Sequence, residues 1–114
     1  MISKEELRAL NLIFAGENEF CFEVRNKINS AQVIDRIDTG VGFTSLIHLT
    51  EKLSKMPNVL MWQFAFDHPS FPEGGSFMCM VLSEEELELE GVALGGKDWP
   101  VGYNLDLFRE QEYF

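Results

Sequence analysis

The longest apolar segment of this chain of 114 residues reads Val59-Leu60-Met61-Trp62-Gln63-Phe64-Ala65-Phe66. In a strand, successive side chains point to opposite faces of the sheet, and here both sets are apolar apart from Gln63. Such a strand is typical of the covered middle of a sheet. Residues 77–82 have the same character. We therefore expect these two segments to form the centre of a sheet, joined by a long loop over residues 67–75, which is rich in Gly and Pro.

The residues at the N-terminus indicate helices. Ser3 and Glu6 have the spacing of a capping box, and apolar residues then repeat at helical intervals. We expect a helix over residues 4–15, ended by a left-handed Gly16. Residues 18–31 fit a strand or a helix by periodicity, but acidic side chains come first and basic ones later, which favours a helix.

A hairpin is predicted in the next part of the chain. Residues 32–38 and 42–50 are rich in β-branched and aromatic types and flank the turn Thr39-Gly40-Val41-Gly42. Two glycines one residue apart permit the positive φ that hairpin turns need. The alternative for the second segment is a helix, because leucines at 46, 49 and 53 also fit a helical repeat.

Residues 86–94 are predicted to form a strand in which leucines point inward and glutamates point to solvent. Before Gly91 the apolar residues occupy odd positions, and after it they occupy even positions. This shift predicts a β-bulge at Gly91. Residues 103–108 would add a last edge strand. The whole predicts an α+β fold in a single domain, residues 1–114, with N-terminal helical segments packed on one face of a mainly antiparallel sheet of about five strands.

Composition limits the class of function. The net charge of −10 argues against nucleic-acid binding, which needs clustered Lys and Arg. Up to Pro57 there are seven basic and eight acidic residues, and beyond it there are two and eleven. No apolar segment approaches the roughly 20 residues of a membrane span, and the acidic N-terminus does not resemble a signal peptide. We expect a cytoplasmic protein, without a membrane partner, whose acidic half could attract a basic protein.

No motif predicts catalysis, a metal or a cofactor. Cys21 and Cys79 lack CxxC spacing and are expected to be buried free thiols, and His68 is expected to be an ordinary loop residue. Phosphate-loop, dinucleotide and nucleophile-elbow motifs are absent. Whether the chain has an activity stays open, with a non-enzyme favoured. A carboxylate row lies about 7 Å apart per step on one strand, as glycosidase pairs do, but a solvated strand face explains it better. Its members are Glu86, Glu88 and Glu90.

Several short motifs follow one another in a familiar order. They are Thr39-Gly40-Val41-Gly42-Phe43, Leu89-Glu90-Gly91 and Trp99-Pro100. In this order the chain resembles a family of small uncharacterised bacterial proteins with a Thr-Gly-x-Gly-Phe hairpin, a Leu-Glu-Gly and a Trp-Pro. The resemblance spans residues 31–108 and implies a fold but no established chemistry.

Three functions are compatible with these features. The first is a non-enzymatic domain, like an immunity protein or antitoxin, that binds a basic protein through Glu86, Glu88, Glu90 and Trp99. The alternative for Trp99 is packing over the end of the sheet. The second function is small-molecule binding, or an unusual enzyme, with a pocket between helices and sheet lined by Trp62, Phe64 and Phe77. The third is a homodimeric scaffold.

Overall fold

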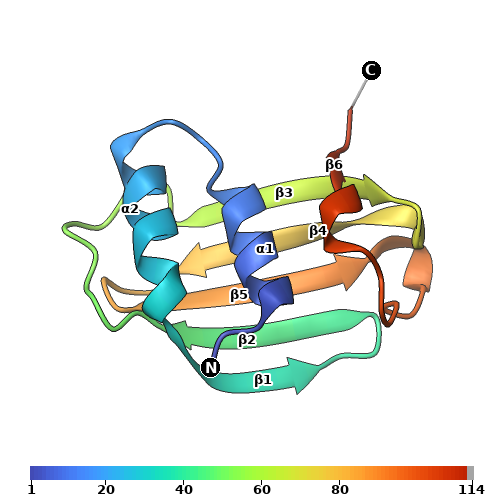
Figure 1. Cartoon of the computed structure of the whole chain (residues 1–114), viewed down its shortest axis with the longest axis horizontal. Helices are drawn as coiled ribbons and strands as arrows, with labels where there is room; N and C mark the ends of the chain where they lie inside the picture. The colour runs from blue at the N-terminus through green and yellow to red at the C-terminus, as the bar shows by residue number, and fades with distance from the viewer. Residues whose placement is uncertain (113–114) are drawn as a thin grey trace.

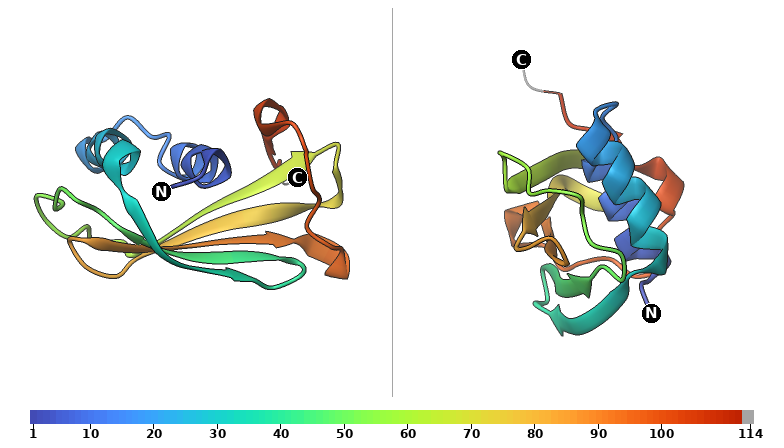
Figure 2. Two further views of the ribbon diagram at one scale, coloured as in Figure 1. Left: turned by 60° about the horizontal axis from the view of Figure 1, so that its bottom comes forward. Right: turned by 90° about the vertical axis from the view of Figure 1, so that its left-hand side faces the viewer.

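A computed structural model describes residues 1–112 and shows two helices packed on one face of a six-stranded antiparallel sheet (Figures 1 and 2). The helices are α1 (Lys4–Ile13) and α2 (Glu19–Lys27), and the short 3-10 helices are η1 (Ile28–Ser30), η2 (Leu94–Gly96) and η3 (Leu105–Leu107). The strands are β1 (Gln32–Asp38), β2 (Gly42–His48), β3 (Met61–His68), β4 (Phe71–Val81), β5 (Glu86–Ala93) and β6 (Arg109–Glu110). The α+β prediction is confirmed, with one strand more than expected.

Helix α1 begins as predicted and ends earlier. The capping box of Ser3 and Glu6 is formed in both directions. The C-cap is Phe14, and Gly16 does not take a positive φ, so the predicted left-handed cap is wrong. The guanidinium of Arg25 instead donates to the carbonyls of Phe14 and Gly16, the latter at 2.7 Å. A side chain of α2 thus satisfies two carbonyls at and just after the end of α1.

The predicted second helix and the hairpin are confirmed. The N-cap of helix α2 is Asn18, whose side chain accepts from the N–H of Cys21 at 2.9 Å. Strands β1 and β2 pair antiparallel, which excludes the helical alternative for the second segment. Only Gly40 in this turn has a positive φ. Gly42 is needed for another reason, because a Cβ there would overlap the carbonyl oxygen of Gly91.

The middle of the sheet is only partly where the sequence placed it, because residues 77–81 lie in a central strand, as expected, whereas residues 61–66 do not. The strand order is β1-β2-β5-β4-β3-β6, so β5 and β4 are central and β3 is followed only by the two-residue β6. Met61 of β3 is 47% exposed. The prediction of a strand covered on both faces fails for β3 because both helices lie on the same side of the sheet (Figure 2). Apolar side chains on the other side therefore stay in contact with water.

The predicted long loop over residues 67–75 is also wrong. Strand β3 continues to His68, β4 starts at Phe71, and only Pro69 and Ser70 make the turn. Here tertiary packing overrides the Gly and Pro composition, because the ring of Phe71 lies 4.9 Å from that of Phe66 and draws the segment onto the sheet.

Strand β5 is regular, and the bulge predicted at Gly91 is absent. Its pairing with β2 and β4 has no register shift, and burial stays on the odd positions through Gly91 and Ala93. Val92 is apolar but faces the side without helices. The predicted last strand over residues 103–108 is wrong too, since this part holds η3 and the paired residues are Arg109 and Glu110.

Aromatic rings dominate the core between the helices and the sheet. One cluster joins helices and β3, with Trp62 stacked on Phe20 at 5.5 Å and tilted against Phe14 at 5.2 Å. The larger cluster fills the other end of the sheet and contains Phe66, Phe71, Phe77, Trp99, Tyr103 and Phe108. Neither α1 nor α2, nor any shorter helix within residues 1–112, is long and apolar enough to cross a membrane.

Candidate functional site

The three glutamates predicted from the sequence lie on the side of the sheet that has no helix. Leu87 and Leu89 of β5 face the helices and are fully buried, so the alternate residues face the other way. We call this side the open face. Cross-strand pairing assigns to it Gln32, Asp35, Ile37, Thr44, Leu46, His48, Met61, Gln63, Ala65, Ser76, Met78, Met80, Glu86, Glu88, Glu90 and Val92.

Apolar side chains flank the central glutamates of the open face. Glu88 is paired with Leu46 on one side and with Met80 on the other. That row continues from Met80 to Met61, which is half exposed. Side chains directly opposite one another in a sheet have Cβ atoms about 5 Å apart, so each carboxylate stands among hydrocarbon groups.

The neighbours of the other two glutamates are more polar. Glu90 is paired with Thr44 and Met78, and Glu86 with His48. Within residues 1–112, no ion pair or side-chain hydrogen bond involves any of the three glutamates. The open face therefore carries a row of three carboxylates without ion pairs, with apolar neighbours on both sides at Glu88 and on one side at Glu90.

Trp99 does not join this row. Its Cη2 lies against Gly91 on the helix side of the sheet, and its ring contacts Phe43 at 5.4 Å and Phe71 at 4.8 Å. Trp99 thus packs over the end of the sheet, which is the alternative to a binding role, although its side chain is only partly buried. The structure thus brings Glu86, Glu88 and Glu90 together on one surface and places Trp99 on the opposite one.

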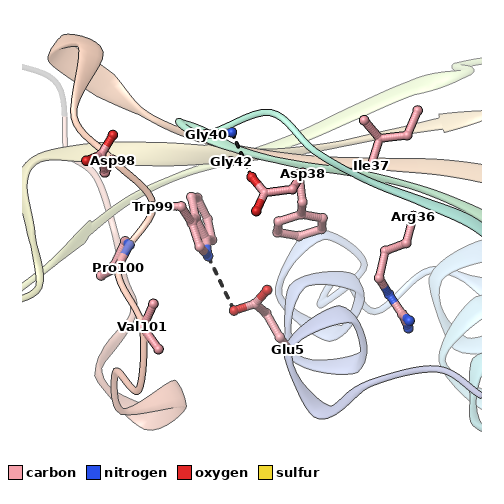
Figure 3. A pocket seen from close by; sticks show the side chains of 11 residues that line it. Glu5, Arg36, Ile37, Asp38, Gly40, Gly42, Asp98, Trp99, Pro100 and Val101 are labelled. Atoms are coloured by element: carbon pink, nitrogen blue, oxygen red, sulfur yellow. Dashed lines mark hydrogen bonds between the residues drawn. The ribbon is translucent and has the colours of Figure 1, made fainter.

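Trp99 lines a pocket that the sequence did not reveal (Figure 3). This pocket, which we call the hairpin-end pocket, has a volume of about 470 Å³ and lies between the first turn of α1, the β1–β2 turn and the segment after η2. Its lining residues are Glu5, Arg36, Ile37, Asp38, Gly40, Gly42, Phe43, Asp98, Trp99, Pro100 and Val101. Nothing local to Glu5 marks it for this role, because it looks like an ordinary acidic residue in the first turn of a helix.

Glu5 is held in the hairpin-end pocket by two aromatic side chains. One of its oxygens, Oε2, accepts from Nε1 of Trp99 at 3.4 Å and from the hydroxyl of Tyr103. Burial raises the pKa of Glu5 above its ordinary value, and the hydrogen bond from Trp99 offsets only part of that effect. The carboxylate is thus partly desolvated and lacks a counter-ion of its own.

The nearest cation, Arg36, is already neutralised. Its Nε and Nη2 donate to Glu6 at 2.9 and 2.6 Å, and Nη2 also donates to the carbonyl of Met1 at 3.1 Å. Ser45 donates to the same carboxylate at 2.5 Å. Burial alone would raise the pKa of Glu6, but these hydrogen bonds outweigh it and lower the pKa to about 2. The Glu6–Arg36 pair ties α1 to β1.

The cysteines and His68 have structural positions. Both thiols are buried and free, as predicted, and burial raises the pKa of Cys79 to about 12. His68 is not a loop residue but a buried member of β3, so that prediction is wrong. Its Nδ1 accepts from the N–H of Ser70 at 2.9 Å and its Nε2 donates to the carbonyl of Asn104 at 2.7 Å.

The side chains predicted to line a small-molecule pocket lie elsewhere. Trp62 belongs to the cluster beneath α1 and α2, and Phe77 is fully buried against Phe66. Neither of them lines the hairpin-end pocket, and neither does Phe64. Across residues 1–112, no three His, Cys, Asp or Glu side chains are grouped closely enough to hold a metal ion.

No family model matches the chain, and no curated protein or solved structure is significantly similar to it. The indications of its function therefore lie in its own surfaces.

Proposed function

We propose that this protein is a non-enzymatic binding domain, comparable in kind to an immunity protein or antitoxin, whose open face binds a basic protein. The observation that carries this proposal is the row of Glu86, Glu88 and Glu90. These carboxylates lie on central strand β5 and have no ion pair, and the middle one, Glu88, has an apolar side chain opposite it on each neighbouring strand.

The chemistry of this surface fits Lys and Arg side chains. A long basic side chain can lay its hydrocarbon stem along Met80 or Leu46 while its charged head reaches Glu88. Within residues 1–112, none of the three glutamates lines a pocket described for the molecule. The open face does offer an area on which a protein surface can rest, with apolar contact at the centre and charge for orientation.

The charge of the whole chain supports the same type of partner. Nearly all of the net charge of −10 comes from residues after Pro57, the part that supplies β3, β4 and β5. Such a field speeds the approach of a cationic partner and weakens as salt is added. A symmetric dimer through the open face would instead bring the glutamates of two copies together, which like-charge repulsion opposes.

The test compares two triple charge reversals with equal net charge. The open-face variant is E86K/E88K/E90K, and the control is E17K/E51K/E112K, which changes exposed glutamates outside the open face. Proteins from the native source that bind the wild type at low salt are identified, and the binding kinetics of each purified candidate are measured. Circular dichroism and melting curves establish that both variants are folded.

For a basic partner we expect the open-face variant to associate at least tenfold more slowly than the wild type, and the control less than threefold. The wild-type association rate should fall steeply between 50 and 500 mM salt. Equal slowing by both variants would show that only net charge matters, and a rate independent of salt would exclude the charge-steered interface.

A further inference from the structure

The hairpin-end pocket supports a second inference that does not depend on the open face. Its apolar wall is formed by Trp99, Phe43 and Pro100, with Val101 at the rim, where it is 98% exposed. The indole of Trp99 is held by edge contacts with Phe43 and Phe71 and by its hydrogen bond to Glu5. The wall is therefore in place before any ligand arrives.

The charged groups of the hairpin-end pocket are mostly carboxylates. Glu5, Asp38 and Asp98 line it, and the single cation, Arg36, is bound through two nitrogens to Glu6. One oxygen of Asp38 accepts from the N–H of Gly40 at 2.7 Å. Glu5 uses Oε2 for its aromatic donors, and within residues 1–112 its Oε1 has no hydrogen-bond partner.

This combination discriminates between classes of ligand. An anion would meet three carboxylates and find Arg36 already occupied. A neutral apolar molecule would cover the aromatic wall, but it would remove water from the carboxylate of Glu5 without offering a new hydrogen bond or charge. A cation on an alkyl chain satisfies both requirements, because its charge reaches Glu5 while its methylene groups contact Trp99.

We infer that the hairpin-end pocket binds an alkylammonium or alkylguanidinium group, with Glu5 pairing with the cation and Trp99 and Phe43 contacting its hydrocarbon chain. Asp38 and Asp98 add further negative charge to the lining of the pocket. This cation can come from a free small molecule or from a Lys or Arg side chain of another protein, since both present the same chemistry.

The probes are n-butylammonium and n-butylguanidinium, compared with 1-butanol and sodium butyrate at equal ionic strength. Binding is followed by the NMR resonance of the Trp99 indole N–H, which a Trp99→Phe variant identifies, because Trp62 gives the other indole signal. We expect saturable shifts of the Trp99 signal with both cations. The Trp62 signal should not move, and neither butanol nor butyrate should saturate the site.

Three variants test which groups bind the cation. Glu5→Gln keeps an oxygen for Trp99 and Tyr103 but removes the charge, and should weaken butylguanidinium binding at least tenfold. Asp98→Asn changes an exposed side chain that has no hydrogen-bond partner within residues 1–112, so the fold of this variant should be intact. It should weaken butylguanidinium binding about threefold. Glu17→Gln, remote from the hairpin-end pocket, should leave binding unchanged.

The source of the cation is resolved with the blocked tripeptide acetyl-Gly-Arg-Gly-amide. Binding at least as tight as that of butylguanidinium assigns the pocket to a protein side chain, and markedly weaker binding assigns it to a free small cation. Equal binding of 1-butanol and butylammonium would overturn the inference, as would unchanged affinity in both Glu5→Gln and Asp98→Asn. None of these results bears on the open face, whose residues are untouched.

Discussion

Gly91 lies directly against the indole of Trp99: a Cβ atom at position 91 would be 3.0 Å from Cη2 of Trp99. The same atom would be 2.5 Å from Cε1 of Phe43. The glycine in β5 therefore leaves the space that the rings of Trp99 and Phe43 occupy. It explains why the strand can be regular and still require glycine at this point.

We predict that Gly91→Ala destabilises the protein by about 1–3 kcal/mol, because the methyl group overpacks a filled core. Urea unfolding followed by circular dichroism measures the change. Val92→Thr is the control on the same strand, since Val92 points to the open face, and it should stay within about 0.5 kcal/mol of the wild type. An unchanged midpoint for Gly91→Ala would contradict the contact.

The pair of Glu6 and Arg36 predicts a pH dependence. The pKa of Glu6 is about 2 in the folded protein, below its ordinary value of 4.5. The folded state thus binds the proton less well than the unfolded state, so the stabilisation is fully present above about pH 4.5. It is lost as the pH falls towards 2.

Glu6→Gln should accordingly lower the free energy of unfolding by about 2–4 kcal/mol at pH 7, because it leaves Arg36 without its counter-ion. The difference from the wild type should shrink between pH 4.5 and pH 2. Urea midpoints across this range test it, with the exposed Glu17→Gln as the control. A difference that stays constant down to pH 2 would show that the charge of Glu6 is not its source.

The buried ring of His68 gives a third prediction. His68→Phe keeps an aromatic ring beside Phe71 and Phe108 but leaves the N–H of Ser70 and the carbonyl of Asn104 without partners. We expect a loss of about 2–4 kcal/mol in unfolding free energy. His48→Phe makes the same change on the open face and should be nearly neutral. Similar melting temperatures for both variants would argue against the two hydrogen bonds.

Local patterns were sufficient for several elements. The capping box at Ser3 marks the start of α1 because its hydrogen bonds connect residues only three apart. The β1–β2 hairpin follows from glycines at its turn. The alternation of Leu87 and Leu89 with glutamates orients β5 correctly, since a strand's side chains alternate whatever its neighbours are.

Features that depend on distant residues were not predictable in this way. Strand β3 reads as a covered strand, but its place beside β6 and its open side are decided by where α1 and α2 pack. The sequence pattern at Gly91 resembles a bulge, but the glycine is required by two aromatic rings from other parts of the chain, those of Phe43 and Trp99.

The sequence by itself determined the helices, the hairpin, the orientation of β5 and the excess of negative charge, because each depends on neighbouring residues or on composition. Only the tertiary structure decided which sheet face lacks a cover and which carboxylates lack a cation. It also brought Glu5 to Trp99, 94 positions away along the chain. Burial and charge pairing are properties of surroundings, and for these residues the surroundings are assembled from segments that the chain keeps far apart.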